Sequence, residues 1–85
     1  TLIEGLLREL SARGLHIGVI KHTHHAMPAD EAGKDSTRFQ TAGAAAVTLA
    51  ASDGAVTRET GEKRLSELLS RMQDVDMILV EGFEK

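Results

Sequence analysis

Apolar residues recur at helical spacing in two stretches of the chain. In the first, residues 2–13, leucines and an isoleucine lie mostly three or four positions apart, and Gly14 follows as a helix-ending residue. In the second, residues 62–72, the apolar positions again fall on one face, at Leu65, Leu68, Leu69 and Met72. The two patterns predict amphipathic helices that cover a sheet.

A different apolar pattern follows each of these helices. Residues 17–20 and Met77–Val80 are nearly continuous apolar runs, which are typical of strands buried in a parallel sheet with helices on both faces. We therefore expect these two strands to be parallel, buried and in one sheet.

The middle of the chain predicts one helix and two more strands. After a polar loop over residues 22–34, a short helix is expected at residues 35–43 and a strand at residues 45–52. An Asp-Gly turn then leads into another strand at residues 55–60. This last strand is too polar to be buried, which favours an antiparallel or edge hairpin.

Together these elements predict an α/β fold in layers, with a mainly parallel sheet flanked by helices. No repeat or linker interrupts the chain, so residues 1–85 are expected to form one domain. The first helix has little room before Leu2 for a cap, and the last strand ends almost where the chain ends. We expect an excerpt of a longer chain, and hence a partial domain.

Composition argues against several classes of function. A net charge of −3 gives no general attraction for phosphate backbones, and aromatics at 2% offer few rings for bases, so nucleic-acid binding is not expected. No apolar run approaches the ~20 residues needed to span a bilayer, and no signal-peptide pattern opens the chain. Without cysteine there is no disulfide or thiolate metal site. These features favour a cytoplasmic protein without a membrane partner.

Two polar clusters directly follow the apolar runs of the predicted sheet. The cluster after residues 77–80 is an acid and a glycine, Glu81 and Gly82. Ligands of α/β sheets gather outside the carboxyl ends of the strands, so both clusters are candidates for one site. The acid matches the layout of a Walker B strand, whose carboxylate holds magnesium directly or through water. The cluster after residues 17–20 consists of Lys21, His22, Thr23, His24 and His25.

The histidines fit three kinds of site. In an extended chain His22 and His24 face one side and His25 the other, so the first two can supply ligands for zinc or nickel. No HExxH motif or second histidine pair completes such a site. The alternatives are histidines that only form hydrogen bonds within the loop, and histidines that donate to an anion. Lys21 and Lys34 favour the anion, because lysine is a compact charge suited to phosphate.

The stretch GKDS resembles half of a phosphate-binding loop. That motif requires Ser or Thr after the lysine, and here Asp35 follows Lys34. We expect instead a helix start, with Asp35 or Ser36 as the N-cap. The free N–H groups of this helix start, with Lys34 beside them, would bind an anion.

The motifs VIKHTHH, GKDS opening a helix that ends in AGA, and the terminal ILVEGF occur in this order at characteristic distances. In this the chain resembles the molybdopterin-guanine dinucleotide biosynthesis protein B family, MobB, over essentially its whole length. The resemblance implies a P-loop NTPase-like fold and GTP binding with magnesium. It further implies an accessory role in attaching a guanine nucleotide to molybdopterin, with a MobA-type nucleotidyltransferase as partner, a homodimer, and at most slow GTP hydrolysis.

The resemblance also implies roles for particular residues. Thr1 would be the last hydroxyl residue of a Walker A loop or the residue just after it, so that the first strand and this loop precede residue 1 and further elements follow residue 85. Glu81 would serve magnesium. The other residues expected to bind nucleotide or phosphate are Lys21, His22, Thr23, His24, His25, Lys34, Asp35 and Gly82.

Two other classes of protein share parts of this pattern. A metallochaperone-type P-loop GTPase would deliver nickel or zinc through the histidines, and a cysteine near them would favour it, but the chain has none. A small-molecule kinase would need an arginine-rich lid, whereas residues 58–71 predict an amphipathic helix.

Overall fold

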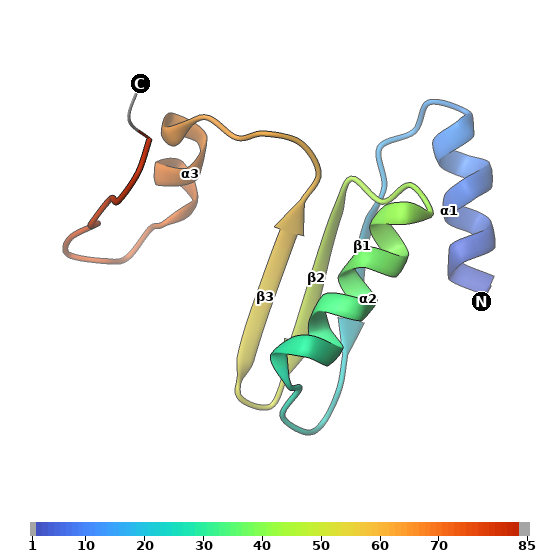
Figure 1. Cartoon of the computed structure of the whole chain (residues 1–85), viewed down its shortest axis with the longest axis horizontal. Helices are drawn as coiled ribbons and strands as arrows, with labels where there is room; N and C mark the ends of the chain where they lie inside the picture. The colour runs from blue at the N-terminus through green and yellow to red at the C-terminus, as the bar shows by residue number, and fades with distance from the viewer. Residues whose placement is uncertain (1, 84–85) are drawn as a thin grey trace.

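The computed structural model describes residues 2–83 as a mixed sheet of three strands with helices beside it (Figure 1). The helices are α1 (Leu2–Ala12), α2 (Ala29–Thr41) and α3 (Leu65–Arg71). The strands are β1 (Gly18–His22), β2 (Ala46–Ala51) and β3 (Gly54–Glu59). The predicted α/β class is confirmed. No helix within residues 2–83 is long and apolar enough to cross a membrane.

The described sheet has the order β1-β2-β3, with β1 and β3 at its edges. β1 pairs with β2 in parallel, with Val19 opposite Val47, and α2 makes the crossover between them. β3 returns antiparallel to β2 and places Arg58 opposite Val47. The predicted antiparallel hairpin is therefore confirmed, and the sheet is mixed rather than mainly parallel.

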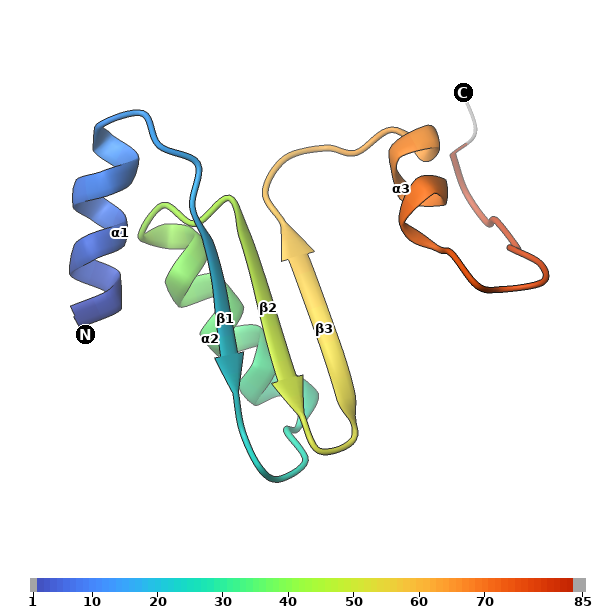
Figure 2. The same cartoon turned by 180° about the vertical axis from the view of Figure 1, so that it is seen from behind.

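The helices α1 and α2 lie on one side of the sheet. Strand side chains alternate between the two faces, and Val19, Val47 and Leu49 on the α2 side are buried. On the other face Ile20 is 78% exposed, and Figure 2 shows no helix in front of that face. The expectation of helices on both faces is wrong for residues 2–83, because α1 packs beside α2 instead of crossing to the far side.

A small apolar core fills the space between the sheet and these two helices. Apolar side chains leave water there, which is the main favourable term in folding. Ile17, Met27 and Ala32 pack against the core from its margin. The core residues are Leu7, Val19, Phe39, Ala42, Ala44, Val47 and Leu49.

Helix α2 begins at Ala29 instead of the predicted Asp35. Pro28 precedes it with φ −59°, a value that proline fixes and that suits a helix entrance. Asp30 and Glu31 then lie in the first turn, where carboxylates interact favourably with the helix dipole. The expected helix start at Asp35 is therefore wrong, and Lys34 and Asp35 lie inside the helix.

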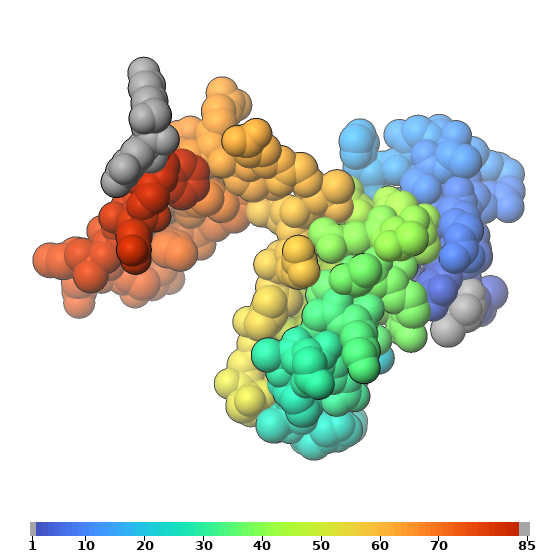
Figure 3. Space-filling view, viewed as in Figure 1, coloured from blue at the N-terminus to red at the C-terminus, as the bar shows by residue number. Residues whose placement is uncertain are grey.

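The C-terminal part of the described chain differs most from the prediction. Met77–Val80 is not a strand, and Leu79 is 88% exposed. The segment instead lies against α3, which extends beyond the end of β3 rather than covering the sheet, as the space-filling view shows (Figure 3). Arg71 of α3 forms an ion pair with Glu59 of β3 at 2.8 Å. The predicted fourth strand is wrong, because Met77, Leu79 and Val80 are exposed beside α3 and pair with no strand of the described sheet.

Candidate anion site at the end of β1

The start of α1 and the carboxyl end of β1 lie at the same end of the molecule (Figure 2). A hollow forms between them, bounded on its third side by α2. Its walls are apolar apart from three basic side chains, those of Lys21, His22 and Arg38. Its lining residues are Leu2, Ile3, Val19, Ile20, Lys21, His22, Arg38 and Phe39.

Alternation along β1 directs Lys21 and His22 to different faces of the sheet. Lys21 lies on the α2 side, where its Nζ is 2.7 Å from Asp35 Oδ2. His22 lies on the uncovered side and is exposed. Both reach the hollow because β1 is an edge strand of the described sheet.

A chain of ion pairs connects β1, α2 and α1. Asp35 Oδ1 lies 3.3 Å from Arg38 Nη2, and Arg38 Nε lies 2.9 Å from Glu4 Oε1. The carboxylates are mostly buried, with 12% of Asp35 and 14% of Glu4 side-chain area exposed, whereas 39% of Lys21 is exposed. Arg38 also stacks over the Phe39 ring, 4.7 Å from its centroid. Two cations and two carboxylates cancel, so the excess positive charge expected from the lysines is not present at this position.

The histidines divide as the extended-chain argument predicted. The rings of His22 and His24 meet edge to face, with centroids 4.8 Å apart. His25 instead lies beside Thr23, whose Oγ1 is 3.1 Å from Nδ1. The Thr23 N–H donates to Ala50 O at 2.9 Å, which fixes the loop to β2. Thr23 and His25 thus shape the loop, and His22 and His24 form a pair at its surface.

A transition-metal site needs more ligands than this pair provides. Among residues 2–83, no group of three or more His, Asp, Glu or Cys side chains is close enough to hold a metal ion. Asp30 and Glu31, the carboxylates that next follow the histidines in the sequence, belong to the first turn of α2.

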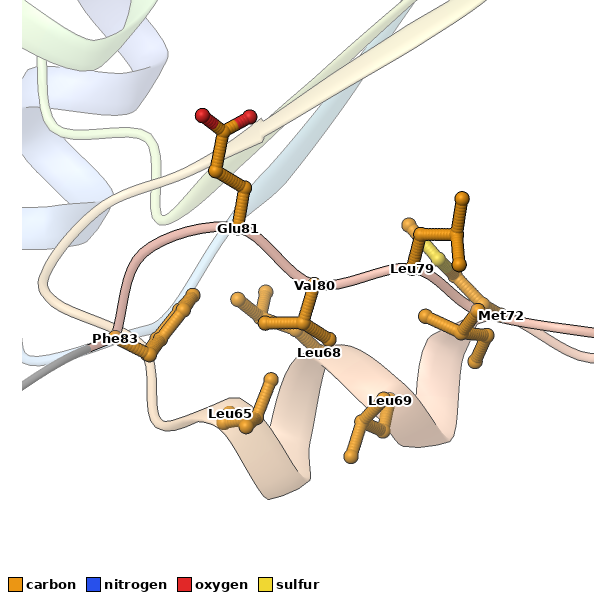
Figure 4. A pocket seen from close by; sticks show the side chains of 9 residues that line it. Leu65, Leu68, Leu69, Met72, Leu79, Val80, Glu81 and Phe83 are labelled. Carbon is orange, nitrogen blue, oxygen red and sulfur yellow. The ribbon is translucent and has the colours of Figure 1, made fainter.

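The remaining predicted residues lie elsewhere. Lys34 is on the outer surface of α2 and lines a separate shallow hollow with Thr37 and Arg58. Glu81 belongs to the segment beside α3, and its carboxylate points away from the apolar side chains there (Figure 4). Gly82 follows with φ +92°. Thr1 lies outside the described residues.

Arg38 is the site residue that sequence reasoning missed. It lies three positions after Asp35, a spacing at which opposite charges meet on a helix surface. That spacing could have identified the Asp35–Arg38 pair once Asp35 was known to be helical. The contact with Glu4 depends on how α1 packs on α2 and has no local signal.

Fold and site define a small α/β protein with a hollow at the carboxyl end of a parallel strand, where a lysine and an arginine are paired with carboxylates and two histidine rings meet. The family model described as Molybdopterin guanine dinucleotide synthesis protein B (MobB) matches residues 1–85. The chain therefore belongs to the MobB family.

Curated relatives carry the corresponding description. A Haemophilus influenzae molybdopterin-guanine dinucleotide biosynthesis adapter protein is 42% identical over 89 residues, covering 100% of this chain and 50% of that protein. The Escherichia coli protein of the same description is 44% identical over 90 residues, covering 99% of this chain and 51% of that protein. The chain thus spans about half the length of these relatives. No solved structure matches it at a significant level.

Proposed function

We propose that this chain is the part of a GTP-binding adapter that contacts phosphate during formation of molybdopterin guanine dinucleotide. The observation that carries the proposal is the hollow in which the start of α1 meets Lys21, His22 and Arg38. A helix start offers unpaired N–H groups to an anion, and lysine and imidazole N–H groups donate to phosphate oxygens. The adapter description of the relatives supports the pathway.

The fold and residue roles follow from the same proposal. In a P-loop NTPase-like fold, Thr1 belongs to or directly follows the phosphate-binding loop, so the nucleotide phosphates lie at the start of α1. Lys21, His22 and His24 contact phosphate of the nucleotide or of the pterin from the end of β1. Thr23, His25 and Asp35 hold these side chains in place, and Lys34 offers a separate anion contact on α2.

Magnesium and a partner protein complete the proposal. The Glu81 carboxylate points away from the apolar residues around it (Figure 4), and carboxylate oxygen is a ligand that magnesium prefers. Gly82 leaves the backbone beside it open for phosphate. A MobA-type nucleotidyltransferase is the partner, molybdopterin or its guanine dinucleotide is the shared ligand, and the adapter acts as a homodimer with at most slow hydrolysis.

Calorimetry on the full-length protein tests the nucleotide part. With magnesium present, GTP should bind more tightly than ATP, and Lys21→Ala should weaken GTP binding by about tenfold, the usual effect of losing one charged hydrogen bond to phosphate. A control is Lys63→Ala, since the Lys63 ammonium donates to Thr60 O at 3.0 Å, outside the hollow. Equal affinity for GTP and ATP, or an unchanged Lys21→Ala variant, would contradict the proposal.

The magnesium part has its own test. Glu81→Gln should keep the fold and weaken the magnesium dependence of GTP binding, because a neutral amide is a poorer ligand for this cation. An unchanged magnesium dependence would remove Glu81 from the site while leaving the role of Lys21 intact.

A further inference from the structure

We infer that Asp35 is an internal counter-ion of Lys21, which phosphate must displace, so that the site selects ligands with two or more negative charges. The inference rests on the proposed function, because it concerns the same phosphate contact. It makes Asp35 a positioning and specificity-determining residue rather than a phosphate ligand.

The two oxygens of Asp35 are held by different cations. Oδ2 contacts Lys21 at 2.7 Å, and Oδ1 contacts Arg38 at 3.3 Å. A buried carboxylate without any partner is strongly destabilising. Asp35 avoids that state when Lys21 leaves, because Arg38 remains beside it.

The exposures of the pair allow the exchange. Asp35 is almost covered, with 12% of its side-chain area exposed, whereas 39% of the Lys21 side chain is exposed. An anion therefore reaches the lysine from solvent without entering the core. The flexible stem of lysine lets its ammonium turn from Asp35 towards His22 in the hollow.

Competition with a carboxylate sets a threshold for the ligand. A singly charged anion offers the Lys21 ammonium no stronger charge interaction than the Asp35 carboxylate already does, and the anion also has to lose bound water. A diphosphate or triphosphate brings several charges and also reaches the imidazole N–H groups and the start of α1. The pair thus keeps chloride and similar monoanions from occupying the lysine.

Asp35→Asn in the full-length protein tests the inference, because it removes the charge and keeps the shape. With GTP and magnesium as the probe, the variant should bind about fivefold more tightly, the upper range for a partly exposed ion pair. Its affinity should also fall more steeply with sodium chloride, since the freed lysine attracts chloride. A purely structural role for Asp35 would lower the thermal stability without either effect.

Two controls locate the effect. Glu9→Gln breaks the surface pair of Glu9 with Arg13 (2.6 Å) and should leave GTP affinity and its salt dependence unchanged. In a Lys21→Gln background, Asp35→Asn should no longer increase the affinity. An increase that persists there would show that Lys21 is not involved and would overturn the inference.

A measurement on the unaltered protein covers the case in which Asp35→Asn does not fold. The side-chain carboxyl carbon resonance of Asp35 should shift on addition of GTP and magnesium, while that of Glu9 stays in place. If the unaltered protein does not bind GTP, the proposed function fails. If it binds but the Asp35 resonance, or the affinity of a folded Asp35→Asn variant, is unchanged, only the counter-ion inference fails.

Discussion

Gly43, just after α2, lies directly against Ser11 of α1. A Cβ built on Gly43 would come within 2.8 Å of the Ser11 Cβ and would overlap the Ser11 hydroxyl. The backbone of Gly43 also has φ +118°, a value that residues with a side chain rarely adopt. The contact between α1 and α2, and with it the geometry of the hollow, therefore depends on a glycine at this position.

Gly43→Ala should destabilise the full-length protein by about 2 kcal/mol or more, because both the φ value and the contact oppose a side chain. Gly5→Ala is the matched control, since Gly5 is within α1 and a Cβ there meets nothing within 4 Å. It should stabilise by about 0.5–1 kcal/mol through helix propensity. Urea unfolding measures both, and a Gly43→Ala midpoint equal to that of the unaltered protein would contradict the close approach.

Val47 lies at the centre of the core and is 0% exposed. Val47→Ala removes two methyl groups from a packed site and should cost about 2 kcal/mol of unfolding free energy. Val56→Ala makes the same change on β3, where Val56 is 56% exposed, and should cost well under half as much. Comparable losses for the two variants would mean that β3 is covered in the full-length protein.

The pKa of Glu67 is lowered by hydrogen bonds at the start of α3. The Arg64 backbone N–H donates to Glu67 Oε1 at 3.1 Å, and the Arg64 Nε donates to the same oxygen at 3.3 Å. A carboxyl whose pKa is lowered on folding stabilises the fold above its ordinary pKa, here 4.5, and that contribution is lost as the pH falls through the lowered value.

Amide exchange of α3 in the unaltered protein should therefore accelerate as the pH falls below about 4.5, after correction for intrinsic exchange. In Glu67→Gln this acid-dependent change should be smaller, because the amide keeps the hydrogen bonds but does not titrate. Glu62→Gln, before the helix, should behave like the unaltered protein. An identical acid response in Glu67→Gln would assign the change to other groups.

Local patterns were sufficient for much of the fold. The apolar spacing and Gly14 predicted α1 and its end, and the Asp-Gly turn predicted the hairpin of β2 and β3. The start of α2 was missed because residues 29–31 are exposed and the following Ala32 and Gly33 are only partly buried, so this part of the helix carries no apolar periodicity. Met77–Val80 was misassigned because a short apolar run reads alike whether it joins a sheet or packs on a helix.

The candidate site was only partly predictable for a similar reason. That His22 and His24 face the same side follows from strand alternation alone, and this prediction was confirmed. The contact of Lys21 with Asp35 joins residues 14 positions apart and depends on how α2 lies across the sheet. No local rule indicated that a lysine expected to be free for phosphate already has a carboxylate partner.

The histidine pair discriminates between the anion site and a metal site. His22 and His24 provide two nitrogen ligands, and no described carboxylate lies close enough to complete a three-ligand group, whereas zinc binds tightly with three or four. Lys21 beside them would also repel a divalent cation whenever it leaves Asp35.

We therefore expect zinc and nickel to bind the full-length protein no more tightly than micromolar. The double variant His22→Ala, His24→Ala should keep its metal content unchanged while its GTP binding weakens. Calorimetry with each metal and with GTP makes the comparison, and His16→Ala is the control because His16 precedes β1. Stoichiometric sub-micromolar metal binding that disappears in the double variant but persists in His16→Ala would instead identify a metal-delivering GTPase.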